Sequence, residues 1–239
     1  MTETALEIRG VTVGYGKTQV LWGVDISVPK NTPVGLFGPN GHGKSTLLRT
    51  ISGLLKPWQG EILLGGKRID GAAPRKIVDL GIIHVPQGNM LFPEMTVYEN
   101  LRLGAFCKRA QPHLKDSLGR VYELFPRLAE RRRQLAKTLS GGERQMLAIG
   151  VGLMGKPTML MLDEPTLGLA PKLKDELLEA IEKILRSGVP LVLVEQDIEF
   201  LLALTDRLFM INHGKVAMDF ASGDQVDRDE IMQMYFGQD

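Results

Sequence analysis

Eight residues near position 40 follow the pattern G-x-x-x-x-G-K-S, which predicts a phosphate-binding loop. Its three glycines let the chain curl so that successive backbone N–H groups face one concave point, and a following helix adds its positive dipole end. The lysine brings charge to the terminal phosphates, and the serine hydroxyl can bind Mg²⁺. The candidate nucleotide-binding residues are the eight residues of this pattern and the threonine that follows it: Gly38, Pro39, Asn40, Gly41, His42, Gly43, Lys44, Ser45 and Thr46.

The segments on either side of this loop have the patterns of a strand and a helix. Residues 34–37 form a short apolar run, which is typical of a buried strand, and residues 46–51 place apolar side chains at helical spacing. A glycine-rich turn with a chance lysine is the plain alternative, and the flanking strand and helix argue against it. The sequence therefore predicts that the chain binds a nucleoside triphosphate.

A second apolar run, residues 159–162, ends in the adjacent carboxylates Asp163 and Glu164. If a parallel sheet brings them to the phosphate loop, Asp163 can hold Mg²⁺, largely through water. Glu164 can accept a hydrogen bond from water behind the terminal phosphate, as a general base or as a residue that orients the water. The alternative, a helix N-cap formed by Asp-Glu-Pro, fits the preceding apolar strand less well.

A second candidate anion site opens the helix predicted from Gly142 to Leu153. One serine hydroxyl, two glycine N–H groups and a helix N-terminus come together there. Taken alone, the same residues could form a simple capping box, with the serine as N-cap and the glutamate completing it. The residues of this site are Ser140, Gly141, Gly142 and Glu143.

The composition is that of an ordinary folded protein and excludes several classes. The chain has 239 residues, 44% of them hydrophobic, and a formal net charge of +1, which argues against a dedicated nucleic-acid surface. A single cysteine, Cys107, excludes a disulfide within the chain. We find no secretory signal and no run of eighteen apolar residues, so we expect a cytoplasmic protein that does not span a membrane by itself.

Alternation and continuity of apolar residues predict two kinds of strand. Alternating runs at 6–13, 24–28 and 61–64 indicate a small antiparallel sheet, and continuous runs at 34–37, 82–85, 159–162, 191–194 and 208–211 indicate buried parallel strands. Helical stretches between the continuous runs predict an α/β fold; one of them, 173–186, has a stripe of Leu173, Leu177, Leu178, Ile181 and Ile184. We expect one domain over 1–239, with a core in about 5–87 and 157–239. An inserted helical subdomain is expected in about 88–156, with helices at 97–106, 117–125 and 142–153.

The three motifs, in this order and spacing, resemble those of ATP-binding-cassette (ABC) ATPases over essentially the whole chain. The segment Leu-Ser-Gly-Gly at 139–142 is the most specific of them. The resemblance implies a P-loop NTPase core with a mostly parallel sheet, a small antiparallel β subdomain and the helical insertion. It also implies ATP and Mg²⁺ as ligands, and a head-to-tail dimer that holds each ATP between one subunit's phosphate loop and the other's Leu-Ser-Gly-Gly segment.

Further residues match the family position by position. Tyr15 matches the aromatic residue that stacks on adenine, and Gln87 matches the glutamine that touches Mg²⁺ and the attacking water and faces the membrane partner. Residues 166–171 match the loop that crosses the dimer interface. The resemblance thus assigns catalysis to Lys44, Glu164 and Gln196, and the metal to Ser45, Gln87 and Asp163.

Four positions depart from the family pattern. Gln196 stands where a histidine is usual, and glutamine can donate a hydrogen bond to the terminal phosphate but cannot carry a proton. Ala170 replaces an aspartate in the interface loop, and His42 replaces a small residue in the phosphate loop. Residues 151–152, Val-Gly, stand where Arg-Ala is common.

The narrower resemblance is to the LivF-like subunits of branched-chain amino acid importers, with urea and amide importers as relatives. It is carried by Glu-Gln at 195–196, Leu-Gly-Leu-Ala-Pro at 167–171, residues 124–132 and Tyr-Phe-Gly at 235–237. It implies an ATPase at the cytoplasmic face of the membrane, bound to permease subunits and to an identical or paralogous ATPase, and acting indirectly with a solute-binding protein. The alternative is a soluble ABC ATPase that acts on DNA or the translation machinery.

Overall fold

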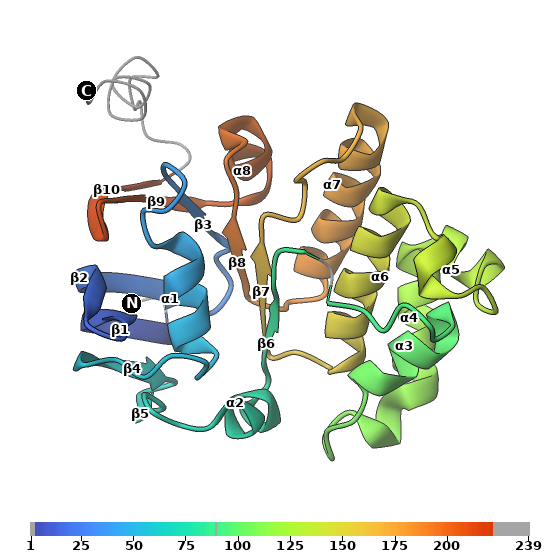
Figure 1. The fold of residues 1–239 in the computed structure, drawn as a ribbon, viewed down its shortest axis with the longest axis horizontal. Coiled ribbons are helices and arrows are strands. Elements are labelled where there is room, and N and C mark those ends of the chain that lie inside the picture. Colours follow the sequence, from blue (N-terminus) through green and yellow to red (C-terminus); the bar gives the residue numbers. More distant parts are fainter. Residues whose placement is uncertain (1–2, 89, 222–239) are drawn as a thin grey trace. The chain divides into compact units, whose positions relative to one another are not determined.

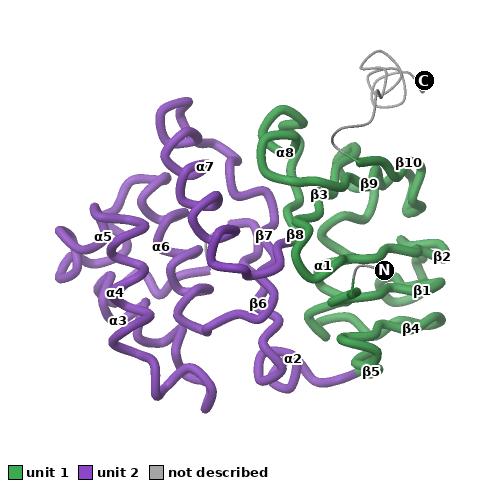
Figure 2. Tube along the Cα trace, turned by 180° about the vertical axis from the view of Figure 1, so that it is seen from behind, with its two compact units in different colours: residues 1–71, 192–239 green, residues 72–191 purple. Residues whose placement is uncertain are grey.

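The computed structural model of the chain describes residues 3–88 and 90–221, in two compact units that Figure 2 draws in green and purple. Unit 1 comprises residues 1–71 and 192–239, and unit 2 comprises residues 72–191. The Tyr-Phe-Gly segment at 235–237 lies outside the described residues. Within the described ranges, no helix is both long enough and apolar enough to cross a bilayer.

Unit 1 contains an antiparallel sheet with the strand order β2-β1-β4-β5, seen in blue to teal in Figure 1. Alternating burial along β1 confirms the predicted half-exposed pattern, since its core-facing side chains include Leu6, Ile8 and Val13. The strands of this sheet are β1 (Thr4–Tyr15), β2 (Thr18–Pro29), β4 (Gln59–Leu64) and β5 (Lys67–Arg68).

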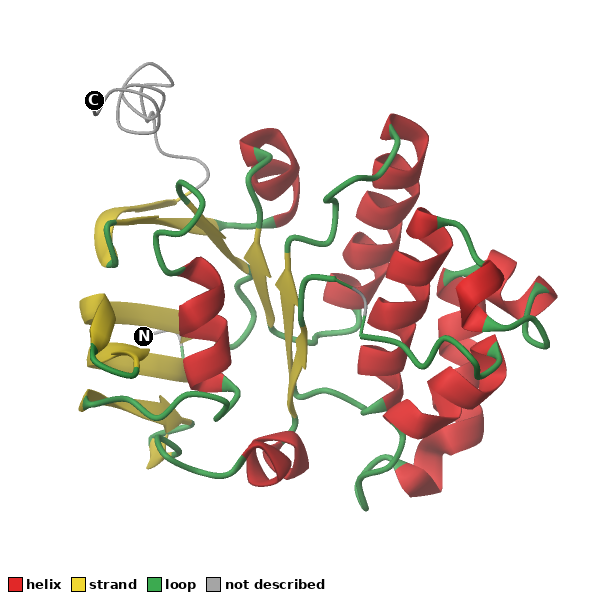
Figure 3. Cartoon of the chain, viewed as in Figure 1, coloured by secondary structure: helices red, strands yellow, loops and turns green. Residues whose placement is uncertain are grey.

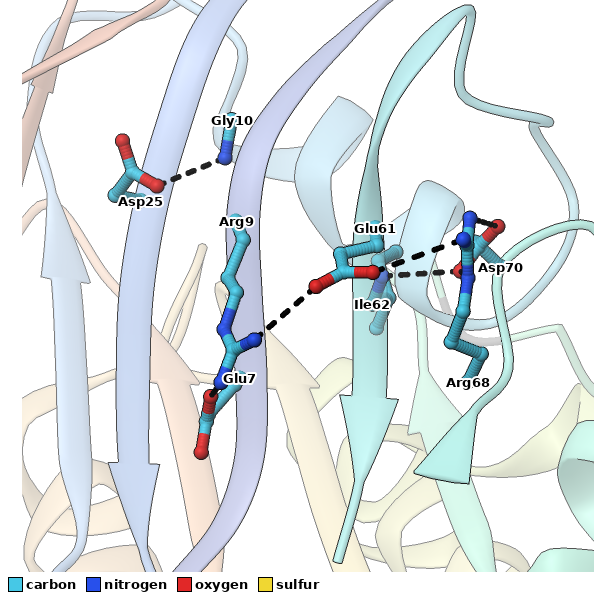
Figure 4. A network of polar contacts seen from close by, with 8 residues as sticks. All are labelled: Glu7, Arg9, Gly10, Asp25, Glu61, Ile62, Arg68 and Asp70. Atoms are coloured by element: carbon cyan, nitrogen blue, oxygen red, sulfur yellow. Dashed lines mark hydrogen bonds and ion pairs between the residues drawn. The ribbon is translucent and has the colours of Figure 1, made fainter. Parts of the chain in front are cut away.

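A network of charged side chains crosses the exposed face of this sheet (Figure 4). Arg9 of β1 forms ion pairs with Glu7 and, at 3.1 Å, with Glu61 of β4. Arg68 pairs with Asp70 at 2.9 Å, and its hydrogen bond is the main reason why the pKa of Asp70 lies below its usual value. Because such pairs are exposed, each adds little stability, but opposite charges on neighbouring strands favour this register over a shifted one.

The same unit carries strands of a second sheet in the order β10-β9-β3-β8. The strand β3 pairs in parallel with β8 and with β9, and β10 returns antiparallel to β9. Every residue of β3 and β8 is buried, as their continuous apolar runs predict. These elements are β3 (Val34–Phe37), α1 (Lys44–Ile51), β8 (Leu191–Val194), α8 (Ile198–Leu204), β9 (Arg207–Asn212) and β10 (Lys215–Ala221).

Unit 2 is built largely of helices and contains the parallel pair β6 and β7 (Figure 3). The helix α6 is buried on most sides, because α3, α4 and α5 pack against it. The elements of the unit are α2 (Pro74–Leu80), β6 (Ile82–Val85), α3 (Val97–Gly104), η1 (Gln111–His113), α4 (Leu114–Leu124), α5 (Pro126–Glu130), η2 (Ala136–Thr138), α6 (Gly141–Met154), β7 (Met159–Asp163) and α7 (Pro171–Arg186).

The predicted α/β architecture is confirmed, with shifts at the ends of some elements. The helix expected from Ser117 begins at Leu114, and the helix expected to reach Phe106 ends at Gly104. The short helices α2, α5 and α8 were not predicted. They are five to seven residues long, too short for helical periodicity to stand out from a run of mixed residues.

Candidate phosphate-binding and catalytic site

The phosphate loop joins β3 to α1 within unit 1. Gly38, Gly41 and Gly43 have φ angles of 136°, 80° and 109°, which residues with side chains rarely adopt. A Cβ on Gly38 would lie 2.0 Å from the carbonyl oxygen of Ile211, so the loop rests directly on the end of β9. The glycines therefore give the loop the curled shape that the motif predicts.

The helix α1 starts without a side-chain cap. Its N-cap is Gly43, which has no side chain to accept a hydrogen bond, and its first turn holds no acidic residue. Lys44 is 4% exposed, and its Nζ donates to the carbonyl oxygens of Gly38 at 2.7 Å and Pro39 at 3.1 Å. The helix start and the lysine thus present positive charge with no acidic side chain in the first turn of the helix, which suits an anion.

The remaining predicted residues of unit 1 lie beside this loop. Asn40 Nδ2 donates to Gln196 Oε1 at 3.5 Å, so Gln196, two residues after the end of β8, lies beside the phosphate loop. Tyr15, at the end of β1, is 43% exposed, and its hydroxyl accepts from Arg49 at 3.0 Å and lies 3.4 Å from Thr46 Oγ1. The ring is therefore anchored to α1 and still offers surface for stacking.

In unit 2, the two carboxylates lie at the end of the apolar strand β7. Asp163 is the last residue of β7 and is 4% exposed, and Glu164 is 8% exposed. Glu164 has φ of 47°, a left-handed conformation that costs a residue with a side chain of order 1 kcal/mol. The Glu164 carboxylate accepts a hydrogen bond at Oε2 from Gln87 Nε2 at 3.1 Å.

The segment at 139–142 ends in a complete capping box at the start of α6. Glu143 Oε2 accepts from the Ser140 N–H at 2.9 Å, Ser140 Oγ accepts from the Glu143 N–H at 3.3 Å, and Arg131 Nε pairs with Glu143 Oε1 at 2.9 Å. Burial works to raise the pKa of Glu143, but the hydrogen bonds with Ser140 and the charge of Arg131 outweigh it, so the pKa is lowered. Because Ser140 Oγ accepts here, its own O–H remains available as a donor.

The two glycines that follow Ser140 have different reasons for lacking a side chain. A Cβ on Gly142 would lie 2.4 Å from Cδ1 of Leu173 in α7, so a larger residue here would make the Leu173 side chain move. A Cβ on Gly141 would meet nothing within 4 Å, and Gly141 does not have a positive φ. The fold of this chain therefore gives no reason for glycine at 141, whereas the close approach of a ligand to the backbone would.

The structure shows the local surroundings of three of the four positions that depart from the family pattern. Ala170 is the N-cap of α7 and offers no side-chain cap, and the proline that follows at the first helical position has a fixed φ that suits a helix start. A Cβ on Gly152 would lie 2.6 Å from Val85 Cγ2, so α6 approaches β6 closely at that glycine. His42 contacts Asn212 and His213 at the β9–β10 turn.

Sequence reasoning missed several residues that hold these groups in place. Asn212 and His213 lie against the phosphate loop, and Arg131 holds Glu143. Asn-His-Gly at 212–214 signals only a hairpin turn, and Arg131 lies in a basic run whose pattern is typical of a solvated face. Neither pattern contains a signal for the contacts that the fold creates.

Comparison with known proteins places these motifs in context. Residues 21–167 match the family described as ABC transporter. The chain is 41% identical over 232 residues to the high-affinity branched-chain amino acid transport ATP-binding protein BraG of Pseudomonas aeruginosa, covering 97% of this chain and 99% of BraG. It is 35% identical over 229 residues to the probable branched-chain amino acid transport ATP-binding protein LivF of Archaeoglobus fulgidus, and this match covers 95% of this chain and 96% of LivF.

A solved structure agrees with these matches. The dimeric post-hydrolysis state of the ATP-binding cassette MJ0796, bound to ADP and Pi, superposes with a TM-score of 0.77 at 25% identity, and the match covers 92% of this chain and 99% of that one. These relatives give no support to the alternative function on DNA or the translation machinery.

Proposed function

Because this chain belongs to the ABC transporter family, we propose that it is the ATP-hydrolysing subunit of a membrane importer for branched-chain amino acids or related small polar solutes such as amides or urea. The observation that carries the proposal is similarity, along almost the whole chain, to two ATP-binding proteins named for branched-chain amino acid transport. Membership of the family makes the chain an ATPase; the solute, the partners and the roles of individual residues are the proposal.

ATP binding is assigned to unit 1. The amides of the loop 38–43 and the start of α1 hold the phosphates, Lys44 reaches the terminal ones, and Tyr15 stacks on adenine. Support comes from the uncapped start of α1 and from the exposed ring of Tyr15, which is tied to the same helix. Gln196 is assigned to the terminal phosphate, because it already accepts a hydrogen bond from Asn40 in the loop.

Hydrolysis is assigned to the carboxylates of unit 2. Glu164 accepts a proton from the attacking water or orients that water, and Gln87 holds the Glu164 carboxylate in position through the 3.1 Å hydrogen bond. Ser45, Gln87 and Asp163 would hold Mg²⁺, since hydroxyl, amide and carboxylate oxygens are the donors that this ion prefers. When bound, Mg²⁺ neutralises charge on the phosphates. Among the described residues, no three acidic, His or Cys side chains form a cluster that could hold a metal ion, and Mg²⁺ usually binds through one or two carboxylates together with substrate phosphates.

Head-to-tail dimerisation is assigned to the start of α6. The proposal is that the Ser140 hydroxyl and the backbone at Gly141 approach the ATP held by the phosphate loop of a second subunit, identical or paralogous. The open space around Gly141 supports this, because a side chain there would block only a partner or ligand. Leu167, which is 56% exposed in the loop 166–171, supplies an apolar contact for the same interface.

Permease docking is assigned to an apolar groove of about 330 Å³ in unit 2. Its lining includes Pro86, Leu91, Phe106 and Val151, together with Met90, which is 80% exposed. A groove of this kind suits a short apolar helix of a membrane protein. One of its lining residues, Pro86, immediately precedes Gln87 in the sequence. The departure at 151, valine where arginine is common, makes the groove more apolar. The resulting location is the cytoplasmic face of the membrane.

The proposal is tested by reconstitution with the permease subunits that are expressed with the chain. Proteoliposomes with ATP on the side of the ATPase should accumulate labelled leucine or a related solute, and Lys44→Ala should abolish both uptake and ATP hydrolysis. Recovery of the chain with ribosomes or DNA, and with no membrane protein, would favour the alternative.

The role of Glu164 is tested separately by Glu164→Gln. This variant should bind ATP, trap a dimer and lose about 10²- to 10⁴-fold in turnover, the range expected when a general base is removed. Turnover at the wild-type rate would show that Glu164 does not have this role.

A further inference from the structure

We propose that Asn212 and His213, at the turn between β9 and β10, are positioning residues for nucleotide binding, and that they act by holding His42 and with it the phosphate loop. The proposal rests on the phosphate-binding role proposed for residues 38–46. It concerns residues that no motif includes and that lie about 170 positions from the loop in sequence.

The contacts between loop and turn involve both the ring and the backbone of His42. Its Nδ1 lies 2.7 Å from Asn212 Oδ1 and 3.0 Å from the backbone nitrogen of His213, and the two histidine rings have centroids 4.5 Å apart. The Gly214 N–H donates to the carbonyl oxygen of His42 at 3.1 Å. Protonated Nδ1 donates to Asn212, and unprotonated Nδ1 accepts from the His213 N–H, so either form of the ring is held by the turn.

The position of His42 within the loop gives this anchor its effect. His42 stands between Gly41 and Gly43, both with positive φ, in the part of the loop with the greatest conformational freedom. Ordering a glycine-rich loop around a ligand costs conformational entropy, and a loop that is already held in shape has less to lose. An anchor at this point therefore raises affinity for phosphate without touching the phosphate.

The turn itself shows that a histidine at 213 is not chosen for local stability. His213 and Gly214 both have positive φ, at 47° and 73°, as in the two-residue turns that favour Asn-Gly. Histidine is a less favourable residue than asparagine for this conformation. A strained residue whose N–H and ring both reach the phosphate loop points to function rather than to turn formation.

The same turn is also fixed to the rest of unit 1. The Trp22 N–H of β2 donates to the carbonyl oxygen of Gly214 at 2.8 Å, and a Cβ on Gly214 would lie 1.8 Å from the carbonyl oxygen of Val20. The phosphate loop is thereby connected, through His42 and the turn, to the antiparallel sheet. The backbone hydrogen bond from Gly214 would remain with any residue at 42, but the contacts of Nδ1 with Asn212 and His213 depend on the histidine ring, because a small residue has no ring to reach them.

The test is a double-mutant cycle on the full chain with the non-hydrolysable nucleotide AMP-PNP, read by calorimetric titration. His42→Ala and Asn212→Ala should each raise Kd roughly three- to ten-fold, the loss expected for one hydrogen bond. The double variant should be no weaker than the weaker single one, since both remove the same contact. At saturating ATP, kcat of Asn212→Ala should stay within two-fold of wild type while KM rises with Kd.

Two further variants separate positioning from plain stability. His213→Asn puts the preferred residue into the turn, so its Tm should equal or exceed that of wild type while Kd rises. Asn31→Ala, an exposed asparagine of unit 1, is the matched control and should leave Kd unchanged. If Asn212→Ala does not fold, Asn212→Ser takes its place in the cycle.

The outcomes distinguish the two proposals. If wild type and Lys44→Ala bind the nucleotide equally, the phosphate-binding role of the loop is wrong. If Lys44→Ala abolishes binding but Asn212→Ala binds as wild type does, or the effects of His42→Ala and Asn212→Ala multiply, the positioning role is overturned and the phosphate site stands. A Kd for His213→Asn equal to that of wild type also overturns it.

Discussion

Two helix starts in this chain carry anion-binding motifs, and they are built in opposite ways. The first turn of α1 has a glycine N-cap, no side-chain cap and no acidic residue. The first turn of α6 has a serine N-cap, a reciprocal capping box and a buried glutamate paired with Arg131. The difference shows that α1 leaves its positive end for a ligand. By contrast, the capping box of α6 already pairs the amides of Ser140 and Glu143, and the helix offers a ligand the Ser140 hydroxyl and the open backbone at Gly141.

The largest effect is expected from placing an acidic side chain in the first turn of α1, where α6 already has Glu143. Thr46 is the third residue of α1, the position that Glu143 occupies in α6, so Thr46→Asp places a carboxylate at the start of the phosphate-binding helix. A negative charge about 6 Å from a phosphate should weaken ATP binding roughly 100-fold at an effective dielectric constant of about 20. Calorimetric titration measures the loss. Thr46→Val, of the same shape and uncharged, is the control, and equal affinities in the two variants would show that α1 does not face the phosphates.

The second prediction concerns the glycine of α6 that has no packing role. Gly141→Asp should leave the fold intact, since nothing lies within 4 Å of its Cβ and an acidic residue suits a helix start. It should lower ATP turnover at least about ten-fold, because the carboxylate would face the triphosphate held by the partner subunit. Steady-state ATPase assays and a thermal melt measure the two effects.

The neighbouring glycine is the matched control for that experiment. Gly142→Ala should lower the Tm, because its Cβ would lie 2.4 Å from Leu173 Cδ1. A stable, fully active Gly141→Asp variant would contradict the proposed approach of the partner's nucleotide to α6.

The third prediction tests the self-capping of α6. Glu143→Ala should lower the free energy of unfolding at pH 7 by about 1 kcal/mol, since it removes half of the capping box. The pKa of Glu143 is lowered in the folded chain, so its contribution is present above its ordinary value of 4.5 and is lost as the pH falls below it. Urea unfolding at pH 7 and pH 4 should therefore show a smaller difference between variant and wild type at the lower pH. An equal difference at both values would mean that the charge of Glu143 plays no part.

The smallest effect is expected at Gln196, which approaches the phosphate loop from the end of β8. Gln196→His should remain folded and active, because imidazole also donates a hydrogen bond. Gln196→Ala should lower kcat by a few-fold, the loss of about one hydrogen bond to the terminal phosphate. Unchanged turnover in Gln196→Ala would show that this side chain does not sense the phosphate.

Much of the fold was predictable from local pattern. The buried strands β3, β7 and β8 were expected from continuous apolar runs, and α7 from a stripe that includes Leu177, Ile181 and Ile184, all buried in the structure. Short elements such as α2 and α5 were not predicted, since a helix of five to seven residues has too few turns to show a period. The strand β5 was not predicted either, because its two residues, which pair with β4 across a tight turn, are too few to show an alternating pattern.

The sequence by itself determined the chemistry of this protein: a loop that can curl around phosphate, two carboxylates after an apolar strand, and a capped helix start with two glycines. Residue type and spacing carry that information, because glycine conformation, charge and capping are local properties. Only the tertiary structure decided that Gly142, and not Gly141, faces a neighbouring side chain. It also decided that Glu164 has a left-handed backbone conformation and a hydrogen bond from Gln87, and that a hairpin turn far along the chain contacts His42. Such contacts join residues remote in sequence, so no local pattern could reveal them.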